Sequence, residues 1–425
     1  MFARREGMAR HLGMMVVQTV VEAGCLTLAV LPIANIFGPV EWGFLGTLLV
    51  AVQLLSMIGD GLYASEVRFI SESHDVDSAY SAALGWFLFL ITLSIAAGLS
   101  ALALVGAGLW AETDASQIVL FVLTAAAGLS RVAKSSIETV FRARRDFDNP
   151  AMAGICSVIP MAITLFVAAA LGGRVASYLA ILAMFQTANA LWLAWVYMSN
   201  MSQNGISAVF DGMKHTARGF ISYSWPLMAR GVVTFGYLKV NLWLIAWLVG
   251  TADAGQYRLA DQFLTIPALL MSAALASFAP RISVAQKSDD PNQLLRLSAR
   301  MYGVMILLSI PFAVGAVFNG IILIPLFPKF AIASQILKWF SIVLLGQGVF
   351  FGGSILMVQG GFPVITFLFT LVASIANITF IYFGARSSGL WGTIEAMICV
   401  QIVTGVVGVW LAHALLKLPF RVSFK

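Results

Sequence analysis

The sequence predicts an all-α polytopic membrane protein with about twelve transmembrane helices in two six-helix lobes, and three observations lead to this fold class. Hydrophobic residues make up 60% of the 425 residues and charged residues only 10%, whereas globular proteins have about 45–50% apolar and ~25% charged residues. The apolar residues form continuous blocks of about twenty, the length of a helix that crosses a bilayer. Because these blocks do not alternate apolar with polar positions, a transmembrane β-barrel is excluded.

The predicted helices follow the apolar blocks in order, and each is bounded by glycine, proline or a short polar segment. They cover residues 12–37, 42–63, 79–110, 116–140, 151–172, 176–199, 221–249, 255–279, 298–322, 334–357, 363–385 and 391–416. The first block follows Arg4, Arg5 and Arg10 and could be a signal peptide. It is too long for the apolar region of a typical signal and contains Glu22, so we expect it to be retained as a span.

Lysine and arginine orient these spans. With the N-terminus inside, the inner segments and adjoining helix ends hold 18 of these residues, and the outer loops hold three, Arg174, Lys329 and Arg386. Cytoplasmic segments of membrane proteins carry this kind of excess, so both termini are expected to be cytoplasmic. The net charge of +6 follows from the same bias and requires no nucleic-acid partner.

Several function classes are excluded or disfavoured. The small share of charged residues excludes a soluble enzyme. The short outer loops disfavour a membrane glycan polymerase or ligase, and the absence of a GxxxxGK[ST] phosphate loop excludes ATP hydrolysis by that route. Cys25, Cys156 and Cys399 lie in separate apolar blocks and the four histidines are scattered, so neither a disulfide framework nor a metal site is expected.

The two halves of the chain resemble each other at an offset of 212 residues. Residues 37–71 lie over residues 249–283, and Gly43 then meets Gly255. Each of these motifs would form an outer turn, a span and a short inner segment. Because six spans per half is an even number, the two halves point the same way and are related by an axis along the membrane normal.

This repeat divides the chain into an N-terminal lobe (1–199), a cytoplasmic linker (200–220) and a C-terminal lobe (221–425). Two lobes that face each other are the plan of a transporter whose substrate pathway lies between them. A membrane scaffold without transport activity would need neither this plan nor charged residues inside its spans.

Six motifs, in a fixed order along the chain, carry a family resemblance. They are FGPVEWGFLGTLL, IGDGLYASEVRFIS, YSWPLMARGVV, VGTADAGQYRLADQFLTIPALL, LFPKFAIASQILKWF and LMVQGGFPVI. Over nearly its whole length the chain resembles the Wzx-type polysaccharide flippases of the multidrug/oligosaccharidyl-lipid/polysaccharide exporter superfamily. It departs from them at Asn35, where relatives often have arginine, and at Asn241, where they often have aspartate, which leaves the ion-coupling scheme open.

The resemblance implies a transporter and not an enzyme. Such flippases move polyprenyl-pyrophosphate-linked oligosaccharides or polysaccharide repeat units from the inner to the outer leaflet of the bacterial cytoplasmic (inner) membrane. The implied partners are the lipid-linked glycan, the membrane lipids, and a glycan polymerase and glycosyltransferases of the same pathway. No cofactor is expected, apart from H⁺ or Na⁺ as a coupling ion.

Charged residues within the seventh and eighth predicted spans are candidates for substrate binding. A charge at the centre of a membrane helix costs about 2.5–3.5 kcal/mol on insertion scales, so each one requires a reason. We expect Arg230, Arg258 and Lys239 to bind the pyrophosphate, because an arginine fork holds two oxygens at once. A straight helix would place Arg230 and Lys239 on opposite faces, whereas a bend near Gly236 could bring Lys239 round. The structural alternatives are an Arg258–Asp261 ion pair and pairing of Lys239 within its own lobe.

The fourth predicted span ends in Arg131, Lys134 and Glu138, whose spacing puts them on one inward-pointing face. One interpretation is an inner mouth that first meets the pyrophosphate, with Arg131 and Lys134 as its ligands. The alternative is an ordinary cuff of positive charge at the cytoplasmic surface.

Acidic side chains inside the spans are candidates for coupling to an ion gradient. Glu22 shares a face with Gln18 near the middle of the first span, and Asp60 lies toward the inner end of the second. Asp261 and Glu138 complete this set of candidates. For Glu22, the alternative is pairing with a basic residue of the cavity.

The nearest alternative function is a cation-coupled multidrug exporter of the same superfamily. Such an exporter would need an acidic cavity for cationic drugs, and the basic residues inside the spans argue against it. A glycan polymerase or ligase is a more distant alternative because of the short outer loops.

Overall fold

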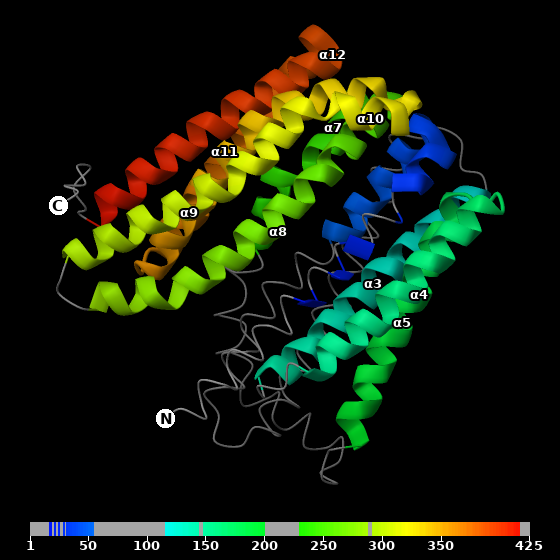
Figure 1. The fold of residues 1–425 in the computed structure, drawn as a ribbon, viewed down its shortest axis with the longest axis horizontal. Helices are drawn as coiled ribbons and strands as arrows, with labels where there is room; N and C mark the ends of the chain where they lie inside the picture. The colour runs from blue at the N-terminus through cyan, green and yellow to red at the C-terminus, as the bar shows by residue number, and fades with distance from the viewer. Residues whose placement is uncertain are drawn as a thin grey trace. The chain divides into compact units, whose positions relative to one another are not determined.

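The structure is a computed structural model, and it describes part of the chain. The described residues are 17–18, 21–22, 24–25, 29, 31–54, 115–143, 148–199, 229–287 and 291–416. Over these residues the chain is helical with short turns and no strand, so the predicted all-α fold class is confirmed (Figure 1). The internal contacts divide the chain into two compact units: unit 1 (Met1–Phe37 and Thr47–Phe235) and unit 2 (Gly38–Gly46 and Gly236–Lys425).

Unit 1 contains three long helices. They are α3 (Ala115–Ala143), α4 (Asp148–Ala170) and α5 (Val175–Ser199). Helix α5 packs against both α3 and α4 (Figure 1). The turn between α4 and α5 depends on Gly172, whose φ of 85° is a left-handed conformation that glycine adopts without strain. The amide of Gly172 donates a 3.1 Å hydrogen bond to Ala169 O and thereby satisfies one of the last carbonyls of α4.

Unit 2 contains the helices that follow residue 236. They are α7 (Val240–Leu248), α8 (Thr251–Lys287), α9 (Pro291–Phe318), α10 (Gly320–Leu326), the short 3₁₀ helix η1 (Pro328–Phe330), α11 (Ala331–Gln359) and α12 (Pro363–Leu415). Helix α11 packs against α8, α9 and α12. Prolines Pro328 and Pro363 lie in the first turns of η1 and α12, where a missing amide hydrogen costs no helical hydrogen bond.

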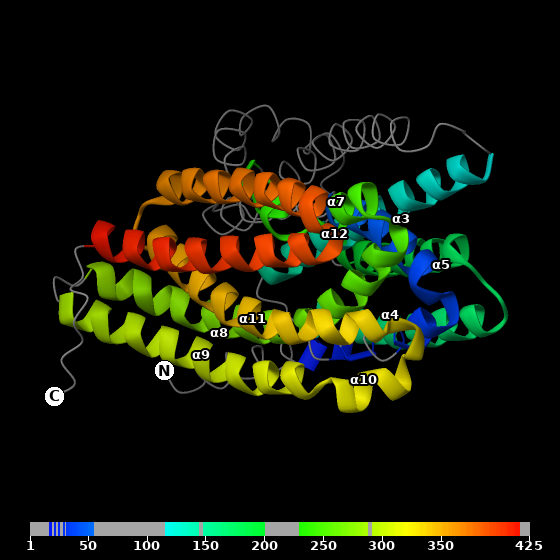
Figure 2. The same ribbon diagram turned by 90° about the horizontal axis from the view of Figure 1, so that it is seen from above.

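Three breaks interrupt these helices. At Ser388 and Gly389 the backbone of α12 leaves helical geometry, so that α12 consists of two helices joined at a kink, drawn in orange and red in Figure 2. This is where the sequence predicts the boundary between the last two spans. The predicted boundary between the first two spans coincides with Gly38, whose φ is 74° within the helix Leu31–Leu54. The third break bends Ala229–Leu238 against Val240–Leu248 by 48°.

The described helices include several membrane spans. Six of them are long and apolar enough to cross a bilayer, or seven if the bent pair around Lys239 counts as one span. Large apolar side chains on these helices, such as Val167, Leu307 and Val406, are exposed, as expected for surfaces that meet lipid rather than water. The chain is therefore a multi-pass membrane protein. The count of twelve spans stays a prediction, since the described residues omit several of the predicted helices.

The two halves of the predicted repeat meet at equivalent glycines. Gly43, on the helix Leu31–Leu54, and Gly255, on α8, lie within unit 2 and are 212 residues apart in sequence, which is the offset of the repeat. A Cβ atom on Gly43 would overlap Thr251 O, and a Cβ atom on Gly255 would overlap Pro39 O. These two oxygens also belong to positions 212 apart, so the contact itself is two-fold symmetric. Only glycine permits two helix backbones to approach this closely.

Candidate functional site

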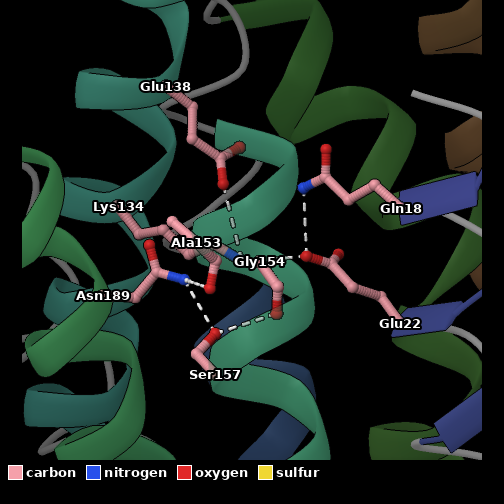
Figure 3. Close-up of polar contacts among 8 residues, drawn as sticks. All are labelled: Gln18, Glu22, Lys134, Glu138, Ala153, Gly154, Ser157 and Asn189. Carbon is pink, nitrogen blue, oxygen red and sulfur yellow. Dashed lines mark hydrogen bonds and ion pairs between the residues drawn. The ribbon is translucent and has the colours of Figure 1, made fainter. Parts of the chain in front are cut away.

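A cluster of charged and amide side chains lies inside unit 1. We call it the Glu22 cluster, and it consists of Gln18, Glu22, Lys134 and Glu138 (Figure 3). Lys134 lies between the two carboxylates, with its Nζ 3.3 Å from Glu22 Oε1 and 3.5 Å from Glu138 Oε1. Gln18 Nε2 donates a 3.1 Å hydrogen bond to the same Glu22 oxygen. The shared face of Gln18 and Glu22 that their spacing predicts is therefore confirmed.

The charged side chains of this cluster are largely buried. Those of Glu22, Lys134 and Glu138 are 29%, 18% and 8% exposed. Charged groups inside a membrane are costly and pair with one another. Here the Lys134 ammonium group lies within ion-pair distance of both Glu22 and Glu138.

The face of α3 toward this cluster has a regular spacing. Ser130, Lys134 and Glu138 follow one another at intervals of four residues and turn inward, whereas Arg131 is exposed. The Ser130 and Thr187 hydroxyl oxygens lie 2.6 Å apart and join α3 to α5. Of the two residues predicted to form an inner mouth, the structure thus places Lys134 in the charged cluster and Arg131 outside it.

Helix α4 lies against the Glu22 cluster and is held in place by α5. Asn189 of α5 is buried, and its Nδ2 donates hydrogen bonds to Ala153 O (3.0 Å) and to Ser157 Oγ (2.7 Å). Ser157 Oγ in turn donates a 3.0 Å hydrogen bond to Gly154 O. Figure 3 shows these contacts beside Glu22, with Gly154 between the Asn189 side and the carboxylate.

A second charged cluster lies in unit 2 at the break after Leu238. We call it the Asp261 cluster, and it consists of Lys239, Arg258 and Asp261. Lys239 Nζ lies 3.0 Å from Asp261 Oδ2, and Arg258 Nη1 lies 4.0 Å from the same oxygen. The side chains of Lys239, Asp261 and Arg258 are 24%, 16% and 9% exposed. The Arg258–Asp261 ion pair and the pairing of Lys239 within its own lobe, which the sequence left as structural alternatives, are thus both present. Two cations share one carboxylate.

Arg258 combines deep burial with an unused donor. Its Nε is buried, and the described part of the chain offers it no hydrogen-bond partner. Gly46 gives the aliphatic part of this side chain its space, because a Cβ there would lie 3.2 Å from Arg258 Cγ. Together with the weak 4.0 Å contact to Asp261, this leaves much of the guanidinium available to a further anion.

A neutral polar network surrounds the same helix break. Asn241 is buried, donates from Nδ2 to Tyr257 Oη (3.3 Å) and Met397 Sδ (3.2 Å), and accepts from Asn377 Nδ2 (2.8 Å). Asn377 also donates a 3.0 Å hydrogen bond to the carbonyl oxygen of Tyr237, two residues before the break. Side-chain amides thus supply hydrogen bonds where the helix is interrupted, as broken membrane helices require.

Sequence reasoning missed three members of this network. Tyr237 Oη lies 2.8 Å from Gln401 Oε1, to which it donates, and 2.7 Å from Thr404 Oγ1. Together with Asn377, these partners lie on α12 and carry no charge. The signal that could have revealed them is the three-residue spacing of Gln401 and Thr404, which places two polar groups on one face of an apolar span.

The remaining predicted residues are placed as follows. Arg230 is partly buried on the helix Ala229–Leu238 and belongs to unit 1, whereas Arg258 and Lys239 belong to unit 2. Asp60 lies outside the described residues. In the described ranges, no group of three or more His, Cys, Asp or Glu residues is arranged to hold a metal ion.

Comparisons with known proteins give one family and one fold. The sequence model of a family described as "Polysaccharide biosynthesis protein" matches residues 10–286. The succinoglycan biosynthesis transport protein ExoT of Rhizobium meliloti (strain 1021) is 23% identical over 415 residues, which cover 93% of this chain and 78% of that relative.

Solved structures of transporters share the fold. A multidrug resistance MATE family transporter of the MOP superfamily, in an inward-facing conformation, matches with a TM-score of 0.76 at 11% identity, over 95% of this chain and 98% of the other. The lipid II flippase MurJ, in an inward closed conformation, matches with a TM-score of 0.69 at 15% identity, over 95% of this chain and 88% of the other. At these identities the likeness concerns the fold.

Proposed function

The chain belongs to the polysaccharide biosynthesis protein family, and from this membership we propose that it is a flippase for lipid-linked glycans. It is a multi-pass membrane transporter and not an enzyme. In our proposal it moves polyprenyl-pyrophosphate-linked oligosaccharides or polysaccharide repeat units from the inner to the outer leaflet by alternating access of two lobes. The name of its relative, a succinoglycan biosynthesis transport protein, supports a glycan substrate.

One observation carries the substrate proposal: the Asp261 cluster has more positive than negative charge. Lys239 and Arg258 share a single carboxylate, and the buried Arg258 Nε has no partner among the described residues. A pyrophosphate would supply the missing negative charge and accept hydrogen bonds from the guanidinium fork. In this proposal Arg258 binds the anion directly, and Lys239 contributes charge.

The Glu22 cluster is the proposed coupling site. Glu22 and Glu138 are carboxylates inside a membrane protein, and both contact Lys134. Uptake and release of H⁺ or Na⁺ at these carboxylates would change the charge of unit 1 during the transport cycle. Arg131, which is exposed on α3, would meet the anion only at the entrance.

The setting of this activity follows from the positive-inside bias. We place the chain in the bacterial cytoplasmic membrane with both termini in the cytoplasm. Cytoplasmic glycosyltransferases would build the lipid-linked glycan, and a polymerase on the outer side would consume it. The glycan would cross the membrane within the transporter while the polyprenyl tail stays in lipid.

The test uses the full-length protein in proteoliposomes with a fluorescent polyprenyl-pyrophosphate oligosaccharide. Arg258→Ala should reduce flipping at least tenfold, because the buried anion site loses its fork. Arg296→Ala, which removes an exposed arginine at the start of α9, should flip at the wild-type rate and serves as the matched control. Wild-type flipping by Arg258→Ala would remove the anion site from this position. Transport of cationic drugs without glycan flipping would favour the multidrug exporter instead.

A further inference from the structure

We infer that Gly154 is a positioning residue for the Glu22 carboxylate, and this inference rests on the proposed coupling function of that carboxylate. The observation is that α4 presents a glycine to the ends of the Glu22 and Gln18 side chains. A Cβ atom at position 154 would lie 2.5 Å from Glu22 Oε1 and 2.7 Å from Gln18 Nε2. Distances below about 3.0 Å are not found for real Cβ atoms, so glycine alone permits the observed arrangement.

The oxygen that a Cβ atom at position 154 would meet is also the oxygen that binds Lys134 and Gln18. Glu22 Oε1 accepts both the 3.3 Å contact from Lys134 Nζ and the 3.1 Å hydrogen bond from Gln18 Nε2. A methyl group at position 154 would therefore push away the atom that binds Lys134. Lys134 would keep its contact with Glu138, 3.5 Å away, and Glu22 would lose its share of the positive charge.

The backbone at this point is fixed, so the side chain would have to move. Asn189 holds Ala153 O and Ser157 Oγ, and Ser157 holds Gly154 O, which ties α4 to α5 immediately around the glycine. Glu22 and Gln18, in contrast, meet the glycine with the ends of flexible side chains. Gly154 thus acts through Glu22. The hydrogen bonds of Asn189 to α4 hold Gly154 next to the Glu22 carboxylate (Figure 3).

The experiment compares two alanine substitutions that differ only in their surroundings. Gly154→Ala should lower gradient-driven flipping about tenfold, which corresponds to ~1.4 kcal/mol, while the protein remains as abundant in the membrane as the wild type. Gly24→Ala lies two residues from Glu22, and its added methyl group would meet none of the described residues within 4 Å, so this variant should flip normally. Equal rates in the two variants would overturn the inference.

A second variant separates positioning from folding. Glu22→Asp withdraws the carboxylate by one methylene, about 1.5 Å, which matches the space that the alanine methyl group takes. Gly154→Ala/Glu22→Asp should therefore flip faster than Gly154→Ala alone, a coupling between neighbours that independent sites do not show. If the double variant is slower than both single variants, Gly154 has only a packing role.

Labelling distinguishes failure of this inference from failure of the coupling proposal. A carboxyl group released from an ion pair adds through its oxygen to the central carbon of a carbodiimide, and the O-acylisourea rearranges to a stable N-acylurea that mass spectrometry can locate. Glu22 should label at least threefold faster in Gly154→Ala than in Gly24→Ala, whether or not Glu22 carries the coupling ion. Unequal labelling with unaffected transport would reject coupling through Glu22 and keep the positioning role, whereas equal labelling would reject the positioning role itself.

Discussion

Replacing Asp261 should lower the free energy of unfolding far more than replacing its nearest partner, Lys239, because the Asp261 carboxylate pairs with two cations. Oδ2 lies 3.0 Å from Lys239 Nζ and 4.0 Å from Arg258 Nη1, and all three side chains are at most 24% exposed. Asp261→Leu leaves both charges uncompensated, and breaking a buried pair in this way costs about 3–5 kcal/mol. Lys239→Met removes one charged hydrogen bond and leaves Asp261 with Arg258, so its cost should be about 1.5–3 kcal/mol.

The double variant Lys239→Met/Asp261→Leu gives the decisive comparison. It leaves one uncompensated cation instead of two, so it should be more stable than Asp261→Leu even though it carries an additional substitution. The measurement is unfolding in mixed micelles with a rising fraction of SDS, followed by tryptophan fluorescence, with Arg296→Ala as the control. The reasoning is refuted if Lys239→Met costs as much as Asp261→Leu, or if the double variant is the least stable of the three.

Three further predictions concern the helix crossing, the coupling site and the topology. Gly43→Ala or Gly255→Ala should sharply reduce the amount of folded protein in the membrane, whereas Gly303→Ala, in open space, should leave it unchanged in a fluorescence-detected size-exclusion assay. Glu22→Gln should still flip the glycan but lose its response to an imposed pH gradient; a wild-type response in reconstituted vesicles would remove Glu22 from coupling. In intact cells an impermeant maleimide should fail to label Arg145→Cys, and labelling from outside would overturn the predicted orientation.

Several helices could be predicted from the sequence because a membrane span is defined by the composition of neighbouring residues. The predicted span 334–357 corresponds to α11 at Ala331–Gln359, and the predicted gap between 385 and 391 corresponds to the kink at Ser388 and Gly389. Long apolar runs and the glycines between them are properties of neighbouring residues. Helical spacing also predicts that Gln18 and Glu22 share a face, which their hydrogen bond confirms.

The partners of the charged residues could not be predicted in the same way. The pairing of Glu22 with Lys134 joins residues 112 apart, and no local pattern specifies it. For Lys239 the sequence left two outcomes open, pairing within its own lobe or a bend near Gly236 that brings it round. The structure has a 48° bend between Ala229–Leu238 and Val240–Leu248, and Lys239 pairs with Asp261. Asn377 and Gln401 are neutral, so their free energy of insertion into a membrane is smaller than that of a charged residue, and a search for buried charges does not find them.

The two glycine contacts described above have opposite consequences for genetic suppression. At Gly154 an added methyl group meets the flexible ends of Glu22 and Gln18, so a shorter side chain at position 22 can relieve the clash. At Gly43 and Gly255 the added group meets backbone oxygens, and the facing residue is already glycine. No substitution across that crossing can make more room. A selection for restored export should therefore return second-site revertants within unit 1 for Gly154→Ala, and only true reversion at the crossing for Gly43→Ala.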